Sequence, residues 1–212
     1  MPAAGASWTS FSKALFDAVF PRKCPLCETI GEPSPCAGCR EQMVPNEPIE
    51  RRSTGLLTFR VAIYPYDGRA AQAVRRLKYS RCTSLTPFMA GEISAWKAKL
   101  GLDPDLVIPV PIHWSRRCTR GFNQAELLCD SLVATKNDLA RVRRTRPQVG
   151  LSESERLTNL QGAFRASAKV AGKRILLVDD VLTSGQTARE CARALRDAGA
   201  AEVGIIAFCG QP

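Results

Sequence analysis

Four cysteines near the start of the chain have the spacing of a metal site. Cys24 and Cys27 form one CxxC pair, Cys36 and Cys39 form a second, and eight residues separate the pairs. Two such pairs can bring four thiolates together in the tetrahedral geometry that Zn²⁺ requires. A site closed by four cysteines favours structural zinc over catalytic zinc, and two disulfides or a redox dithiol are the alternatives. The other five of the nine cysteines have no such spacing, and we interpret most of them as packed apolar residues: Cys82, Cys118, Cys129, Cys191 and Cys209.

A second pattern places acids and hydroxyls directly after an apolar strand. Residues 175–178 are apolar and are followed by Asp179 and Asp180. The carboxylates can accept hydrogen bonds from vicinal hydroxyls, and the turn after them offers backbone N–H groups, hydroxyls and a helix N-terminus to a phosphate monoester. Together these groups suit a ribose 5-phosphate, whereas the alternative is an acidic cap on an ordinary strand-turn-helix unit. The residues of the predicted turn are Thr183, Ser184, Gly185, Gln186 and Thr187.

The positive charge of the chain is confined to two stretches. The formal net charge is +10, and residues 69–81 and 113–146 each contribute +5, so the remainder is balanced. Such a surplus indicates an anionic partner such as a phosphate ligand, a nucleic acid or a membrane surface. Rossmann and Walker motifs are excluded, because no GxGxxG follows a strand and Gly172-Lys173 is followed by Arg174.

The elements that must position these groups alternate between strands and helices. This alternation predicts an α/β fold with a mostly parallel sheet and helices on both faces. We expect strands at 57–63, 106–110, 140–142, 174–178 and 203–208, and helices at 70–78, 87–100, 123–136 and 186–198. The long polar connection at 144–162 has the character of a functional loop.

Three regions are expected along the chain. Residues 1–20 read as an amphipathic helix, 21–55 as a small zinc-ribbon module, and 56–212 as the α/β domain. The module is too poor in apolar residues to fold by core burial alone, which is why it requires a metal. No apolar run has the ~18 residues of a membrane span, so we expect a soluble, cytoplasmic protein.

These motifs resemble those of the type I phosphoribosyltransferases, and more closely the ComF family, which joins a zinc ribbon to a phosphoribosyltransferase domain and is associated in some bacteria with DNA uptake. The resemblance runs from Cys24 to Cys209. It is carried by the CxxC pairs, Tyr66-Asp67-Gly68, Leu77-Lys78-Tyr79, Pro109-Val110-Pro111 through Arg116, Arg120-Gly121-Phe122-Asn123-Gln124, Arg144-Thr145 with Gln148, Leu151, Arg156 and Asn159, and residues 175–187.

The resemblance implies a type I phosphoribosyltransferase fold that binds 5-phosphoribosyl 1-diphosphate (PRPP) through Asp179, Asp180 and the turn at 183–187. The loop after Val110 would take the diphosphate, and 144–162 would close over the reaction. Gln186 stands where the family usually has a small residue, but a cradle made of backbone N–H groups tolerates it.

If the ligand is PRPP, the reaction is a pentosyl transfer to a nitrogenous acceptor. Negative charge then develops on the departing diphosphate, which Mg²⁺ and arginines can stabilise. The candidate catalytic residues are Arg116, Arg120 and Arg156, with Arg117 beside them on position alone. His113 could bind diphosphate or move a proton, or it could be an ordinary strand-end histidine.

A second hypothesis is an accessory protein without turnover. It would keep the PRPP cradle and use its basic surface and zinc ribbon to hold single-stranded DNA or a protein of the competence machinery. Tyr64, Tyr66 and Tyr79 near the first basic stretch could stack on bases, although ordinary packing explains them equally well. The sequence does not identify the acceptor.

Overall fold

The computed structural model describes residues 21–31, 34–47, 55–130, 132, 134–135, 137–143 and 160–211. Three expectations lie outside these residues: the helix predicted in 1–20, the candidate catalytic residue Arg156, and residues 144–159 of the predicted closing loop.

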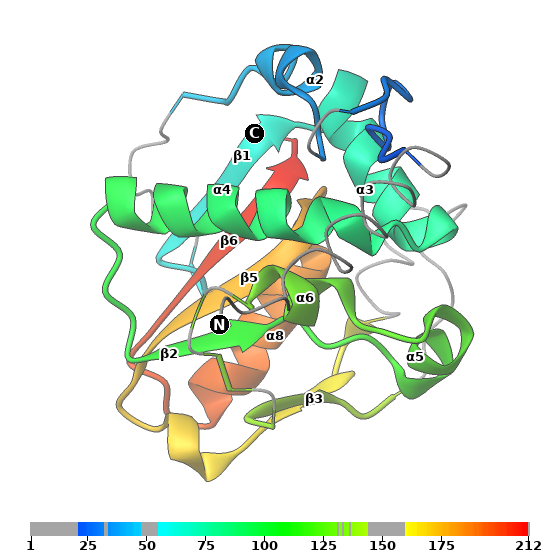
Figure 1. Cartoon of the computed structure of the whole chain (residues 1–212). Helices are drawn as coiled ribbons and strands as arrows, with labels where there is room; N and C mark the ends of the chain where they lie inside the picture. The colour runs from blue at the N-terminus through cyan, green and yellow to red at the C-terminus, as the bar shows by residue number, and fades with distance from the viewer. Residues whose placement is uncertain are drawn as a thin grey trace, which may run out of the picture.

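A four-stranded parallel sheet forms the centre of the molecule (Figure 1). Its order is β1-β6-β5-β2, and every neighbouring pair is parallel, which confirms the predicted sheet. Runs of Val, Ile and Leu form these strands, because a parallel sheet covered on both faces buries consecutive residues. The strands are β1 (Phe59–Pro65), β2 (Leu106–Pro109), β5 (Arg174–Leu182) and β6 (Glu202–Gly210).

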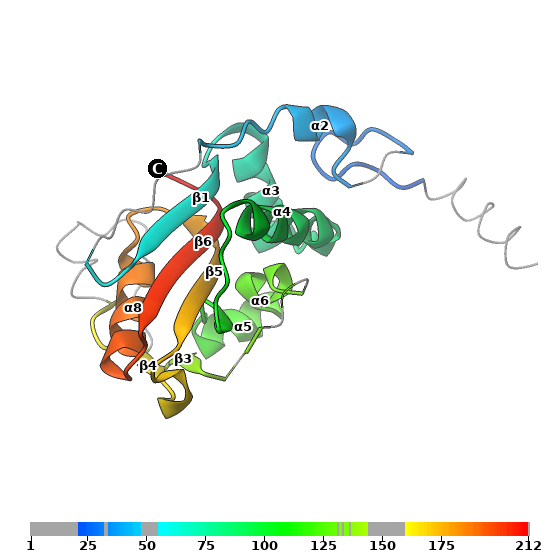
Figure 2. The ribbon, with the colours of Figure 1, turned by 90° about the vertical axis from the view of Figure 1, so that its left-hand side faces the viewer.

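Helices cover both faces of the sheet (Figure 2). On one face α3, α4 and α6 enclose a core that includes Leu176 and Val178 of β5. On the other face α8 packs on a second core that includes Ile175 and Leu177. The helix bounds are α3 (Gly68–Ser80), α4 (Thr86–Lys99), α6 (Gln124–Leu128) and α8 (Gln186–Asp197).

A separate antiparallel pair lies beside this sheet. Strand β3 (Leu139–Arg141) pairs with β4 (Phe164–Ala166), and the predicted strand at 140–142 is therefore not part of the parallel sheet. Strand β4 was not predicted, because three residues are too few to show a pattern. The remaining short elements are α2 (Ala37–Glu41), η1 (Thr83–Leu85) and η2 (Ala168–Val170).

Two differences from the predicted elements affect the site. Strand β5 continues to Leu182, so Asp179 and Asp180 lie within the strand and not after it. Helix α5 (Trp114–Arg120) was not predicted, because it buries none of its residues and so lacks an apolar face.

Helix α6 is shorter than the predicted helix at 123–136. It ends at Leu128, and the chain then turns toward the free edge of β2. There Ala134 forms a parallel bridge with Val107, and the Thr135 N–H donates to the Val107 carbonyl at 2.9 Å. Pairing with an otherwise open strand edge satisfies backbone groups that a longer helix would leave exposed.

Candidate functional site

Six of the predicted site residues line one cavity at the carboxyl ends of β2 and β5. Its volume is about 390 Å³, and it opens where parallel α/β sheets commonly bind ligands. Two predicted arginines, both acids and two hydroxyl residues of the turn line it: Arg116, Arg120, Asp179, Asp180, Thr183 and Thr187. Lys78, Tyr79, Asn123, Gln124 and Arg141 also contribute to its wall.

The two acids project from opposite faces of the sheet. Successive side chains of a strand alternate, so Asp180 shares the face of Val178, whereas Asp179 shares the face of Leu177. Both carboxylates still reach the cavity, because it lies at the end of the sheet. The predicted pair therefore consists of two groups with different surroundings.

Asp180 is held by a lysine of the covering helix. The Lys78 Nζ atom of α3 lies 3.0 Å from Asp180 Oδ2, and the two side chains are 22% and 7% exposed. Burial lowers the pKa of Lys78, but the charges of Asp180 and Asp179 outweigh burial and raise it overall. Lys78 thus stays charged at neutral pH and neutralises one acid of the pair.

Replacing Lys78 by Met should therefore destabilise the fold. The change leaves the buried Asp180 carboxylate without a counter-ion, which typically costs about 3 kcal/mol. Adding Asp180→Asn to Lys78→Met should restore most of the free energy of unfolding, measured by urea denaturation. Equal stability of the single and double variants would show that the ion pair has no such role.

The surroundings of Asp179 disfavour the ionised form of its carboxyl group. Burial raises its pKa well above the ordinary value, and the neighbouring Asp180 carboxylate raises it further. Its Oδ1 atom accepts the backbone N–H of Asp180 at 2.8 Å, which fixes the orientation of the carboxylate. Asp179 lines both the large cavity and the adjoining turn.

The turn at 183–187 encloses a small depression next to the cavity. Asp179, Ser184, Gly185 and Gln186 are among the residues that line it, and Gly185 caps the start of α8 with φ +72°. Ser184, Gly185 and Gln186 face this depression and not the large cavity. The backbone N–H groups at the start of a long helix suit a small anion.

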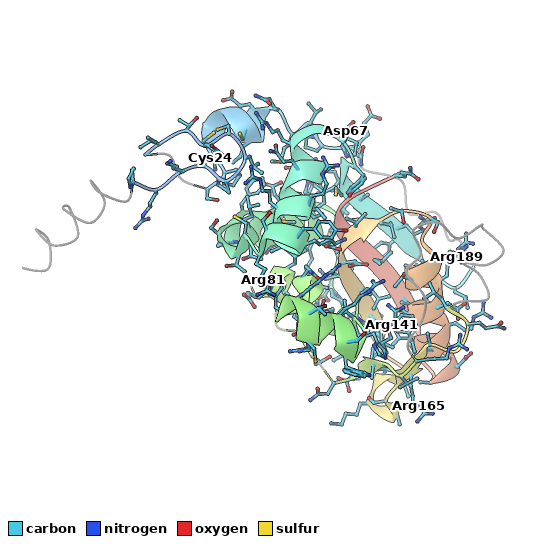
Figure 3. The ribbon with its side chains drawn as sticks, turned by 90° about the vertical axis from the view of Figure 1, so that its right-hand side faces the viewer. Cys24, Asp67, Arg81, Arg141, Arg165 and Arg189 are labelled. Atoms are coloured by element: carbon cyan, nitrogen blue, oxygen red, sulfur yellow. The ribbon has the colours of Figure 1, made fainter. Side chains whose placement is uncertain are left out.

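Arg60 of β1 supports this turn from the sheet side. Its Nη2 atom donates to the Thr183 carbonyl at 3.4 Å, and an added Cβ at Gly185 would lie 2.8 Å from the same nitrogen. Burial, and then the charge of Arg189 on α8, lower the pKa of Arg60. Arg189 is labelled on α8 in Figure 3.

Gly185→Ala should consequently destabilise the protein. A left-handed conformation costs a residue with a Cβ about 1–2 kcal/mol, and the methyl group would also displace Arg60. Gly91→Ala in α4 is the matched control, because nothing lies within 4 Å of its added Cβ and Ala favours a helix interior. We expect Gly185→Ala to lower the melting temperature and Gly91→Ala to raise it. A higher melting temperature for Gly185→Ala would contradict the strained backbone geometry of Gly185.

Positive charge dominates the cavity wall. Four cations line it, Lys78, Arg116, Arg120 and Arg141, against the two acids. Burial and then Arg120 lower the pKa of Arg116, while burial and then Arg116 lower the pKa of Arg141. The three guanidinium groups thus repel one another in a partly buried wall, and an anion would relieve that repulsion.

Several residues near the cavity differ from expectation. Arg117 does not line it and pairs instead with Glu126 at 2.7 Å, because its side chain projects from the outer surface of α5. His113 is buried and its Nδ1 atom accepts the Ser115 N–H at 3.3 Å, which makes it the N-cap of α5. Cys118 is exposed.

Lys78 and Arg141 were not among the predicted site residues. Each belongs to one of the two basic stretches, which was the available signal, but only the tertiary fold shows which bases face the cavity.

The four cysteines of the CxxC pairs form a compact cluster. Their sulfur atoms all lie within 4.8 Å of one another, with 3.9 Å between Cys24 and Cys39 and 3.4 Å between Cys27 and Cys36. Four thiolates bound at 2.3 Å around a tetrahedral ion would lie about 3.8 Å apart. Hydrogen bonds with Thr29 lower the pKa of Cys27 to about 6. The cluster could therefore bind a metal ion.

The cysteine module is attached to α3. The carbonyl of Leu26, between the first two cysteines, accepts hydrogen bonds from Arg69 Nη1 at 2.9 Å and Gln72 Nε2 at 3.1 Å. Farther along the helix, Arg76 lies 3.9 Å from Glu28. The same helix supplies Lys78 to the cavity. Figure 3 shows Cys24 well apart from Arg141 of the cavity wall.

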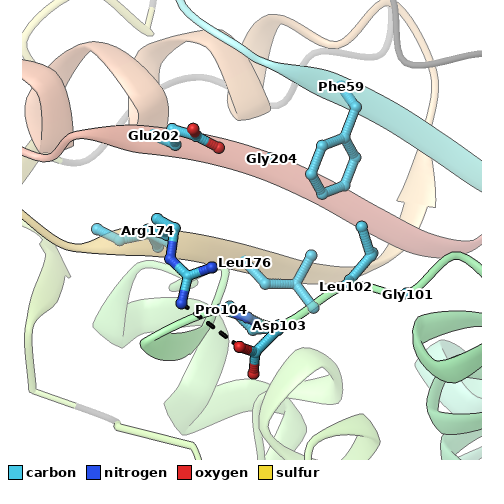
Figure 4. A pocket seen from close by; sticks show the side chains of 10 residues that line it. Phe59, Gly101, Leu102, Asp103, Pro104, Arg174, Leu176, Glu202 and Gly204 are labelled. Atoms are coloured by element: carbon cyan, nitrogen blue, oxygen red, sulfur yellow. Dashed lines mark ion pairs between the residues drawn. The ribbon is translucent and has the colours of Figure 1, made fainter.

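A second pocket lies at the amino ends of β5 and β6 (Figure 4). It has a volume of about 110 Å³ and an apolar floor that includes Phe59 and Leu176. Its cation, Arg174, is already paired with Asp103 at 3.5 Å and Asp105 at 3.0 Å. The other charged group that lines it is the acid Glu202, so this pocket lacks the excess of positive charge found in the cavity at the opposite end of the sheet.

The three tyrosines have different exposures. Tyr64 is buried and its hydroxyl donates to Glu92 at 2.7 Å, so it belongs to the core. Tyr66 is 39% exposed and Tyr79 is 75% exposed. Arg120 lies 6.0 Å from the Tyr79 ring at the cavity wall.

Within the part of the chain that the structure describes, no helix has the length and apolar character to cross a membrane.

Comparisons with known proteins show which proteins this chain is similar to. Residues 116–212 match the family model of the phosphoribosyl transferase domain. The DNA utilization protein YhgH of Salmonella typhi is 34% identical over 200 residues, which cover 88% of this chain and 83% of that protein. Competence protein ComFC of Bacillus subtilis (strain 168) is 30% identical over 181 residues, which cover 84% of this chain and 73% of that protein.

A solved structure of the allosteric regulatory enzyme of purine biosynthesis overlaps with 63% of this chain and 30% of that one, at 21% identity and a TM-score of 0.42. The two sequence relatives, and not this partial overlap, carry the assignment to a family.

Proposed function

Because this chain belongs to the ComF family and contains a phosphoribosyl transferase domain, we propose that its cavity binds PRPP and transfers the phosphoribosyl group to a nitrogenous acceptor. The turn at 183–187 would hold the 5-phosphate, and Asp179 and Asp180 would accept hydrogen bonds from the ribose hydroxyls. Arg116 and Arg120 would stabilise the negative charge of the departing diphosphate. Arg156, which lies outside the described residues, would have the same role.

The observation that carries this proposal is the charge of the cavity wall. Four cations against two acids leave an excess of positive charge, which suits a ligand with several phosphoryl groups. Asp179 lines both this cavity and the depression at the turn, and a sugar beside it would join the two phosphate ends of the ligand.

Magnesium fits this arrangement as a companion of the diphosphate. Lys78 already neutralises Asp180, so Asp179 is the carboxylate left to interact with a cation or its waters. The ion would supply charge neutralisation to the leaving group. The chain's own part is to orient the diphosphate toward Arg116 and Arg120.

We propose that the four-cysteine cluster binds structural zinc. The sulfur separations fit a tetrahedral thiolate site, and four cysteines leave no open position for a substrate. We also propose that residues 21–55 and 56–212 are separate domains and that the protein acts in the cytoplasm.

Calorimetry and product release test the enzyme hypothesis together. The wild-type protein should bind PRPP in the presence of Mg²⁺ and bind ribose 5-phosphate more weakly. Diphosphate release should then be measured against a panel of nucleobases, amines and single-stranded DNA. Release with one acceptor would establish a transferase, and absence of PRPP binding would refute the proposal.

A second candidate function is binding of single-stranded DNA or a competence protein without turnover. The observation that favours it is the exposed Tyr79 ring beside Arg120, with the exposed Arg75 and Arg81 on the same basic stretch. Stacking rings next to cations suit unpaired bases. The names of the relatives, DNA utilization protein and competence protein, point the same way. Salt-dependent DNA binding that Tyr79→Ala weakens, with no diphosphate release, would support this function.

A further inference from the structure

Gln124 lines the cavity and carries a buried hydrogen-bond donor without a partner among the described residues. It is the first residue of α6, and its side chain is 2% exposed. Gln124 is one of the residues that line the cavity wall, and its Nε2 atom is buried with no hydrogen-bond partner among the residues that the structure describes. Buried polar groups are satisfied in most proteins, so an exception inside a cavity points to a ligand.

The unpaired amide does not result from a loosely placed helix. The neighbouring Asn123 uses both ends of its side chain: Oδ1 accepts the Ala125 N–H at 3.1 Å, and Nδ2 donates to the Val110 carbonyl at 3.1 Å. These bonds fix the start of α6 against the end of β2. Gln124 is therefore held in place by contacts that leave its own amide free for another group.

The position of Gln124 indicates which part of a phosphoribosyl ligand it would contact. It belongs to the wall formed by the loop after β2 and by α5, which also contributes Arg116 and Arg120. The turn at 183–187 belongs to β5 and α8, and Gln124 does not line the depression there. A group that meets Gln124, Arg116 and Arg120 must offer oxygen acceptors to several donors.

We propose that Gln124 Nε2 donates a hydrogen bond to a non-bridging oxygen of the diphosphate, so that Gln124 distinguishes PRPP from ribose 5-phosphate. This inference rests on the proposed phosphoribosyl ligand. The alternative recipient, a carbonyl oxygen of the acceptor, is separated from it by the experiment below.

Gln124→Met tests the donor while keeping an unbranched side chain of similar length. A hydrogen bond to a charged group is commonly worth about tenfold or more in affinity. We expect the variant to bind PRPP and inorganic pyrophosphate about tenfold more weakly, with ribose 5-phosphate affinity unchanged. The ligand-free variant should also melt at a higher temperature, because it no longer buries an unpaired amide.

Gln124→Glu tests the charge of the ligand group. A glutamate in the first turn of a helix is compatible with the fold, but its carboxylate would repel a diphosphate. Repulsion between charges a few ångströms apart should reduce PRPP and pyrophosphate affinity by at least about 100-fold. Ribose 5-phosphate should again be affected little.

Thr135→Val is the matched control. Its hydroxyl is also buried without a partner, but Thr135 does not line the cavity, so the variant should change stability and leave all three affinities unchanged. Equal weakening of ribose 5-phosphate and PRPP by Gln124→Met, unchanged PRPP and pyrophosphate affinity, or a lower melting temperature would each overturn the proposal. A wild-type protein that binds neither PRPP nor pyrophosphate would overturn the proposed function as well.

Discussion

A Cys36→Ser variant should lose the native structure of the described module residues 21–31 and 34–47 while the parallel sheet remains folded. Apart from cysteines, Leu26, Pro35 and Met43 are the buried apolar side chains of the described module. Such a small core cannot offset the conformational entropy of ordering the chain. A structural zinc site supplies about 10 kcal/mol or more, so loss of one ligand should unfold the module.

Amide NMR spectra with and without a strong chelator measure this effect directly. Signals from the module should collapse in both the variant and the chelated wild type, while signals from β5 and β6 persist. Cys118→Ser is the control, because that cysteine is exposed and lies outside the module. A metal-free protein that keeps the native module spectrum would refute the zinc site.

Asp179→Asn should abolish Mg²⁺-dependent PRPP binding and at the same time stabilise the ligand-free protein. The loss of affinity follows from removing the carboxylate that Lys78 does not neutralise, and we expect it to exceed about 100-fold. The gain in stability follows from the raised pKa of Asp179, because folding must bury a charge that asparagine does not carry. Asparagine keeps an oxygen for the Asp180 N–H.

The pH dependence of stability shows whether the Asp179 carboxylate stabilises or destabilises the native state. When folding raises the pKa of an acid, ionisation of that acid destabilises the native state as pH rises above the ordinary value of 3.8. Below that value the acid is protonated in both the folded and the unfolded state, so this loss of stability vanishes. The difference in free energy of unfolding between Asp179→Asn and wild type should therefore be larger at neutral pH than in acid, and it should vanish near pH 3.8 and below. Urea denaturation across the pH range measures it.

Asp105→Asn is a control with the opposite sign. Hydrogen bonds from Arg174 lower the pKa of Asp105 to about 2, so its carboxylate stabilises the native state at neutral pH and loses that effect as pH falls through about 2. This variant should be less stable than wild type and bind PRPP normally, because Asp105 lies at the amino end of β2, whereas the cavity lies at the carboxyl end. A destabilised Asp179→Asn, or one that keeps its affinity, would contradict the assigned role.

Local patterns predicted the parts of the site that depend on neighbours in sequence. The CxxC spacing predicted the cysteine cluster, because two residues between cysteines fix how close the sulfur atoms can come. The acids and the turn at 183–187 were likewise predicted to line one site. The parallel order of the strands followed from the alternation of apolar strands and helices.

The parts that were missed depend on contacts between distant segments. Val181 and Leu182 continue the apolar pattern beyond the two acids, and this signal could have shown that Asp179 and Asp180 lie on opposite faces. The pairing of Lys78 with Asp180 joins residues 102 positions apart, and no local pattern encodes it. Arg141 reaches the cavity from a two-stranded sheet that was not predicted.

Helix α3 contacts both the cysteine module and the cavity. Its first turns hold the Leu26 carbonyl of the cysteine module, and its last turns hold Lys78 against Asp180, about 14 Å away along the helix axis. Linkage of this kind is reciprocal. Any factor by which the metal improves ligand affinity through α3 is the factor by which the ligand improves metal affinity. If this coupling is favourable, the protein without metal would bind its ligand less tightly, and the protein without ligand would bind the metal less tightly by the same factor.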